Sequence, residues 1–192
     1  MKPVRANVSS RLRGDPSACI YAIPIADIRR ECQCAVGQRD SVRRMAASPE
    51  QLHSAFMYCL NFARHMLEDS ASFLPFGAKL TGSGEVQAVG GWNGEEHPAP
   101  AELYAMLAAA FRNEAESGNI AGSALAVDVN IPLEYSPTLP DGIRVHLEGE
   151  GFSRYIYVPY SIKTVGPLRR KREIVLAEPF SVEVPAEVFV SQ

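Results

Sequence analysis

Hydrophobic residues along the chain change their spacing near its middle, from a helical period to the two-residue period of strands. Ser48-Pro49, with a Gln three positions after the Ser, is typical of a helix N-terminus closed by a capping box. Apolar residues then recur every three or four positions, which predicts an amphipathic helix that ends near Asp69. A second stripe of the same kind predicts another helix over about 100–117.

The segments around and after the second helix read as strands. Two short runs separated by Gly82-Ser83-Gly84 predict a β-hairpin over 76–81 and 86–91. Beyond the second helix, alternation of apolar and polar residues predicts further strands. These are 123–133, 143–148, 152–160 and a last strand over 174–184. Pro179 should bend or bulge the last strand at a sheet edge, because proline cannot donate a ladder hydrogen bond.

These elements predict a two-layer α+β domain. Clean alternation in the later strands is typical of an antiparallel sheet with one face in water. We therefore expect five to six antiparallel strands, with both amphipathic helices packed on the same face. The order is helix, two strands, helix and three strands, with an extra strand possible at the end.

Charge divides the 192 residues into two unlike parts. Residues 1–44 hold nine basic and four acidic side chains, a net +5, whereas residues 45–192 hold ten basic and 18 acidic ones, a net −8. We predict one folded domain over 45–192, preceded by either a flexible basic extension or a wrongly assigned start. Within 1–44, the apolar run 18–25 could form one short strand, and Pro24 would limit it to an edge.

Several function classes lack their sequence signals. The longest apolar run is the nine residues Leu103–Phe111, so no membrane-spanning helix is expected. Cys32-Gln33-Cys34 has too short a spacing and too few companions for a zinc site, and reduced thiols are typical of a cytoplasmic protein. Cys59 falls in the apolar stripe of the first helix and should be a core residue. Phosphate-loop, zinc-protease and nucleophile-elbow motifs are missing, so we predict no metal, no cofactor and no catalytic group.

One face of the predicted sheet gathers polar and aromatic side chains. If consecutive strands pair, this face carries the seven candidates Asp128, Asn130, Arg144, His146, Glu148, Tyr155 and Tyr157. The simplest interpretation is the solvent face of a half-buried sheet. Tyr and Arg are favoured at interfaces, so a protein-binding face is the next interpretation. The alternative is a ligand pocket or weakly catalytic site in which Asp128, His146 and Tyr155 converge.

Two loops are further candidates. The basic cluster Arg169-Arg170-Lys171-Arg172 could contact phosphates or an acidic protein surface, although a solvated hairpin loop is the simpler interpretation. The polar loop before the second helix carries the candidates Trp92, Glu95, Glu96 and His97. It could form a site, but a solvated connection leading into the helix is the simpler interpretation.

The stretch Phe-Leu-Pro-Phe-Gly-Ala-Lys-Leu-Thr-Gly-Ser-Gly-Glu over 73–85, after an amphipathic helix, resembles a pattern in small bacterial proteins of uncharacterised function. Separately, the order of helices and strands resembles the roadblock and profilin-like folds. The resemblance implies a domain that dimerises, scaffolds or binds small ligands rather than one that catalyses a reaction. The final strand and the missing closing helix depart from the roadblock pattern.

We therefore expect a cytoplasmic bacterial domain that acts by binding or regulation. The expected partner is another protein, with a second copy of the chain as one candidate. Nucleic acid is disfavoured by the acidic charge of the folded part, and no membrane partner is expected.

Overall fold

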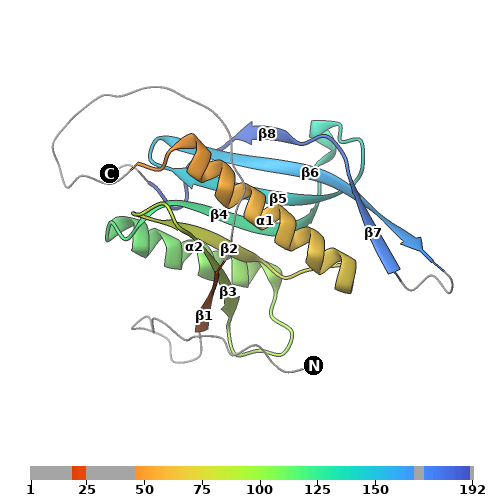
Figure 1. The fold of residues 1–192 in the computed structure, drawn as a ribbon, viewed down its shortest axis with the longest axis horizontal. Coiled ribbons are helices and arrows are strands. Elements are labelled where there is room, and N and C mark those ends of the chain that lie inside the picture. The colour runs from red at the N-terminus through yellow and green to blue at the C-terminus, as the bar shows by residue number, and fades with distance from the viewer. Residues whose placement is uncertain (1–18, 25–45, 167–170, 191–192) are drawn as a thin grey trace.

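The structure is a computed structural model that describes residues 19–24, 46–166 and 171–190 (Figure 1). This part of the chain contains two α-helices, one short 3₁₀ helix and eight strands. In chain order they are β1 (Cys19–Pro24), α1 (Pro49–Ser70), β2 (Phe76–Thr81), β3 (Val86–Trp92), α2 (Pro100–Glu116), β4 (Ile120–Asn130), η1 (Leu133–Tyr135), β5 (Asp141–Gly149), β6 (Phe152–Val165), β7 (Lys171–Leu176) and β8 (Phe180–Glu183).

All strands pair antiparallel in one curled sheet, with the order β1-β3-β2-β4-β5-β6-β7 and with β8 beside β6. The α+β class, the antiparallel sheet and the order of helices and strands are confirmed. Strand β1 pairs with 87–92 of β3 at the sheet edge, where Pro24 can be accommodated. Six residues of the predicted extension thus join the sheet, while 1–18 and 25–45 lie outside the described residues.

The last strand is interrupted, as Pro179 predicts. Tyr160 lies opposite Leu176 in β7, whereas Tyr157 lies opposite Phe180 in β8. The register therefore changes by one residue across 177–179, which is a one-residue bulge. The strand also begins at Lys171, three residues earlier than its apolar pattern indicates.

The prediction that both helices cover one face of the sheet is wrong. Neighbouring residues of a strand point to opposite faces, and in β4 they meet different helices. Ala124 and Ala126 join the apolar cluster of α1, whereas Leu125 joins the cluster of α2. Figure 1 shows α1 and α2 on opposite sides of the sheet. The fold therefore has three layers around β2 and β4.

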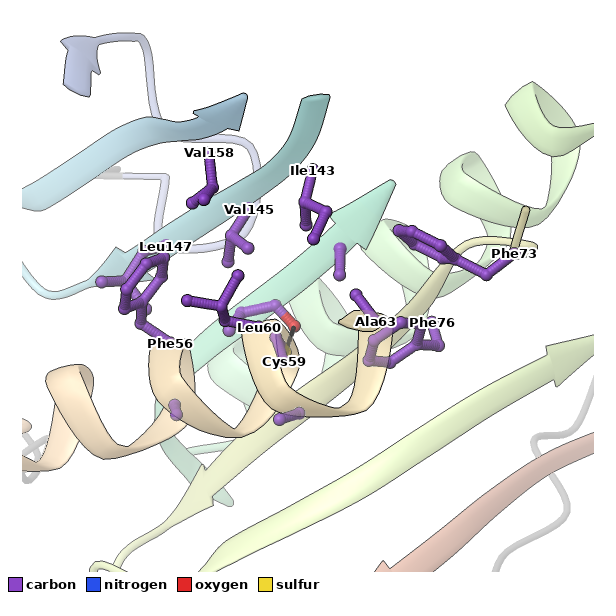
Figure 2. Packing of buried hydrophobic residues seen from close by; sticks show 14 of the residues in the cluster. Phe56, Cys59, Leu60, Ala63, Phe73, Phe76, Ile143, Val145, Leu147 and Val158 are labelled. Atoms are coloured by element: carbon purple, nitrogen blue, oxygen red, sulfur yellow. Dashed lines mark hydrogen bonds between the residues drawn. The ribbon is translucent and has the colours of Figure 1, made fainter. Parts of the chain in front are cut away.

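Helix α1 builds the larger apolar cluster against the middle of the sheet (Figure 2). Its buried stripe includes Phe56, Cys59, Leu60 and Ala63, which point toward Ile143, Val145, Leu147 and Val158 of β5 and β6. Cys59 is fully buried, so the prediction that it is a core residue is confirmed. Neither described helix combines the length and apolar character that crossing a membrane requires.

The predicted capping box at the start of α1 is confirmed. The Ser48 hydroxyl accepts a hydrogen bond from the Gln51 backbone N–H at 3.3 Å, and the Gln51 side chain accepts one from the Ser48 N–H at 2.8 Å. Replacing Ser48 with alanine should lower the free energy of unfolding by about 1 kcal/mol, because one helix N–H loses its acceptor. Urea unfolding measures this loss. Ser70→Ala, an exposed position at the other end of the helix, should change the free energy by much less.

Candidate functional site: a buried polar cluster and an aromatic strip

The pairing of β5 with β6 brings five of the predicted candidates to one face of the sheet. Arg144 lies opposite Tyr157, and His146 lies opposite Tyr155. Glu148 follows on the same face, two residues after His146, as the strand period requires. Leu125 of β4, which contacts α2, lies opposite His146, so this face is the one that α2 covers.

The other two candidates from the sheet lie on the opposite face. Asp128 pairs with Ile143 rather than with Arg144, so its side chain points to the α1 side. There its carboxylate accepts a hydrogen bond from the Tyr160 hydroxyl at 2.8 Å. Asn130, on the same side, donates to Asp141 at 2.9 Å. Asp128 therefore cannot share a pocket with His146, and the convergent pocket that the alternation suggested is not formed.

The polar residues of β5 are buried rather than facing solvent, contrary to the simplest interpretation of the alternation. His146 and Glu148 are each 1% exposed. Two elements cover them: helix α2 and residues 184–190, which we call the C-terminal segment. Val188 and Phe189 of this segment pack with Leu107 and Phe111 of α2. We call these two side chains and the partly buried ones around them the buried polar cluster: Tyr104, His146, Glu148, Ser153 and Glu187.

The carboxylate of Glu148 binds the C-terminal segment through its backbone. Its oxygens accept hydrogen bonds from three consecutive N–H groups, those of Glu187, Val188 and Phe189, at 3.0–3.2 Å. Burial raises the pKa of Glu148, and these three donors oppose that effect because they stabilise the charged form. The arrangement requires an acceptor at this position, and an ionised carboxylate has the necessary lone pairs.

His146 connects helix α2 with β6 and with Glu148. Its Nδ1 lies 2.9 Å from the Tyr104 hydroxyl of α2, and its Nε2 lies 3.0 Å from the Ser153 hydroxyl and 3.1 Å from Glu148 Oε1. Burial, followed by the charge of Arg144, lowers the pKa of His146 to about 4. The ring is therefore neutral at pH 7. An ionised Glu148 can only accept, which favours the proton on Nε2. Nδ1 and the Glu187 carboxylate are then the two acceptors for the single proton of the Tyr104 hydroxyl.

Glu187 was not among the sequence candidates. Its carboxylate lies within hydrogen-bond distance of two hydroxyls, those of Tyr104 at 3.2 Å and Tyr155 at 3.4 Å. Its backbone carbonyl accepts from Arg112 at 2.6 Å. Tyr104 was missed as well, although it lies three residues before Leu107 and so continues the apolar stripe of α2. No local signal pointed to Glu187, because its role depends on how the chain returns across the sheet.

Beside the buried polar cluster, aromatic rings follow one another across β6, β8 and η1. We call this the aromatic strip: Tyr135, Arg144, Tyr155, Tyr157 and Phe180. The rings of Tyr157 and Phe180 stack with their centres 5.2 Å apart, and the centres of the Tyr135 and Tyr157 rings are 5.5 Å apart. The Arg144 guanidinium carbon lies 4.4 Å from the centre of the Tyr155 ring and 5.3 Å from that of Tyr104. Both distances are within the range of cation–π attraction.

The two loop candidates lie apart from these groups. Arg169 and Arg170 lie outside the described residues, while Lys171 is exposed in β7. Arg172 donates to the Asp69 carbonyl at 2.7 Å, so it binds the C-terminal end of α1, where a cation is favourable.

The polar loop beside β3 is solvated. Trp92 Nε1 donates to the Glu95 carbonyl at 3.0 Å, and the side chains of Glu95, Glu96 and His97 are exposed. The loop therefore folds on itself, and these side chains face water.

Two surface hollows, of about 460 and 320 Å³, lie beside Asp128 rather than beside His146. In the part of the chain that the structure describes, no three His, Cys, Asp or Glu side chains gather as metal ligands. Cys32 and Cys34 lie outside the described residues. Comparisons of the chain with family models, curated proteins and solved structures found no match. The arguments for function therefore come from this geometry.

Proposed function

We propose that the chain is a non-catalytic binding domain that docks another protein on the aromatic strip. The observation that carries this proposal is the placement of Arg144 between two tyrosine rings, beside the partly exposed rings of Tyr135, Tyr155 and Phe180. Tyr157, which stacks on Phe180, is buried beneath them. Tyr and Arg are the residue types that contribute most to the binding energy of protein interfaces. Leu133, in η1 together with Tyr135, is 86% exposed and adds apolar surface.

The charge of the strip favours a partner segment with an acidic residue beside an apolar one. Arg144 supplies the cation, and the rings of Tyr135 and Phe180 supply apolar contact. Among the described residues, no carboxylate forms an ion pair with Arg144. An acidic group from outside the chain would complement that charge.

The polar groups of β5 support binding more than catalysis. The ring nitrogens of His146 and the carboxylate of Glu148 already have partners within the chain. A general acid or base must reach the proton that it transfers. These two side chains are covered by α2 and by the C-terminal segment, so we assign them the structural role of holding that segment in place.

The proposal is tested with two variants, Tyr135→Ala in the aromatic strip and Leu133→Asp on the exposed surface of η1 beside it. A protein captured from a native extract by the wild-type chain is identified, purified and titrated against each variant by calorimetry. We expect each variant to weaken binding by about tenfold or more, because each removes apolar contact at the centre of the interface. Both residues are partly or largely exposed, so the variants should remain folded.

Trp92→Ala is the matched control. Trp92 is also a large, exposed apolar side chain, at 45% exposure, but it belongs to β3 and not to the strip. The control should bind as the wild type does. Unchanged affinity in both the Tyr135 and Leu133 variants, or a loss only in the Trp92 variant, would contradict the proposal. If the captured protein is a second copy of the chain, and the variants weaken its binding in the same way, the chain forms a homodimer through the strip.

We extend the proposal to a cytoplasmic location. Its support is the thiol of Cys59, which is buried and has no disulfide. Burial raises the pKa of this thiol far above its usual value, so it behaves as an apolar core group.

A further inference from the structure

We propose that Arg144 is a receptor for a carboxylate of the partner protein, and that the negative charge of Glu187 weakens the binding of this carboxylate. The inference deepens the proposed function and rests on it. It names one cation on the aromatic strip as the recognition point and one acid of the C-terminal segment as its regulator.

The first step is the state of the Arg144 guanidinium. Two tyrosine rings flank it, at 4.4 Å and 5.3 Å from its central carbon. Its Nε atom is buried and has no hydrogen-bond partner among the described residues. A buried donor without an acceptor lowers stability, because it has lost its hydrogen bond to water. The chain therefore leaves one donor of this cation without an acceptor, although the guanidinium shares a hydrogen bond with the Tyr157 hydroxyl.

Arg154, in the same sheet, is an arginine that has an ion-pair partner within the chain. Its guanidinium also lies near an aromatic ring, 5.8 Å from the centre of Phe152. It differs in having polar partners on β8: the Glu183 carboxylate at 3.7 Å and the Ser181 hydroxyl at 3.4 Å. The two arginines thus differ mainly in whether the chain supplies a counter-charge.

The second step is the chemistry of the missing ligand. A guanidinium group presents its donors in a planar fork that matches the two oxygens of a carboxylate. Phosphate groups are usually bound by several cations together. Arg144 is a single cation in a folded part that carries a net charge of −8, and Glu187 lies next to the same two tyrosines. These surroundings favour a ligand with one negative charge, which is a carboxylate.

The third step is the role of Glu187. Its carboxylate reaches the Tyr104 and Tyr155 hydroxyls, at the far ends of the rings that flank Arg144. It therefore places a negative charge near the site without forming an ion pair with the guanidinium. A second carboxylate arriving at Arg144 is repelled by this charge. Removing the charge of Glu187 should strengthen carboxylate binding, whereas a purely structural Glu187 would leave it unchanged.

The test is an NMR titration of the arginine Nε–H signals of the full chain with sodium propionate at constant ionic strength. The signal that disappears in Arg144→Lys is assigned to Arg144, and the Arg154 signal is the internal control. We expect a saturable shift of the Arg144 signal, half complete at a propionate concentration about tenfold below that for Arg154. Glu187→Gln should lower the concentration needed at Arg144 and leave Arg154 unaffected.

Three results would overturn the inference. Arg144 and Arg154 could respond alike to propionate, or neither could respond. The Glu187→Gln variant could leave the Arg144 titration unchanged, which would show that the charge of Glu187 does not affect carboxylate binding. Inorganic phosphate could saturate the Arg144 signal at about a tenfold lower concentration than propionate, which indicates a phosphorylated ligand. Because no protein partner is present, a failure here is distinct from a failure of the Leu133 and Tyr135 variants.

Discussion

Replacing Glu148 with glutamine should lower the free energy of unfolding by about 3 kcal/mol. The amide has almost the shape of the carboxylate, so the change is electrostatic and not a change of volume. It puts an N–H₂ donor where three backbone N–H groups and His146 Nε2 all point. At least one of these buried donors is left without an acceptor, and the negative charge that they share is gone.

Urea unfolding measures the loss, and hydrogen exchange locates it. The amides of 187–189 should exchange faster in the Glu148 variant, because the C-terminal segment loses the group that binds it. Glu150→Gln is the matched control, since Glu150 is an exposed glutamate in the turn that follows β5. Equal stability of the two variants, or unchanged protection at 187–189, would show that Glu148 does not hold the segment.

Acidification should destabilise the protein through His146. Its pKa is about 4 in the folded chain, against 6.5 as its ordinary value, so the unfolded chain binds a proton that the folded chain does not. The stabilisation is complete above pH 6.5 and is lost progressively as the pH falls toward 4. The loss over this window is about 3 kcal/mol, of which about 2 kcal/mol is reached at pH 5.

The measurement compares free energies of unfolding at pH 7 and pH 5 in the wild type and in His146→Gln. Burial raises the pKa of Glu148, which acts with the opposite sign, and the variant retains that effect. The difference between the two proteins therefore reports His146. His65→Gln, at a side chain 68% exposed on α1, should keep the wild-type dependence. If the free energy of unfolding changes with pH no more in the wild type than in the His146 variant, the His146 ring is not buried in its neutral form.

The parts of the fold that could be predicted are those with local physical causes. The capping box at Ser48 and the apolar stripe behind it are complete within one stretch of sequence. The same is true of the bend at Pro179, because a missing N–H is a property of that residue alone. These features formed where the sequence indicated.

The layering could have been predicted but was not. In β4, residues on both alternations are apolar or small, as in Ala124-Leu125-Ala126-Val127, and nearly the whole strand is buried. A strand buried on both faces has no polar alternation over its length. In this strand only Asp128 and Asn130, at its end, suggested a wet face, and the expectation of a two-layer domain extended to β4 the alternation of the later strands.

The candidate site could be predicted only in part. Five candidates share a face because every second residue of a strand points the same way and because paired residues of β5 and β6 lie side by side. They are Arg144, His146, Glu148, Tyr155 and Tyr157. Placing Asp128 with them needed the register between β4 and β5, and a shift of one residue moves a side chain to the other face. A connection of ten residues separates these two strands, and the length of that connection does not set the register.

The contact between Glu148 and the C-terminal segment also has a consequence for synthesis. A ribosome makes β5 some forty residues before it makes residues 187–189, so a growing chain carries the Glu148 carboxylate before its three donors exist. Folding during synthesis proceeds from the N-terminal side, and the sheet can pair before this segment emerges. Closure over His146 therefore has to wait for the synthesis of residues 187–189, and a chain halted before Glu187 would present an acidic, hydrated opening in its place.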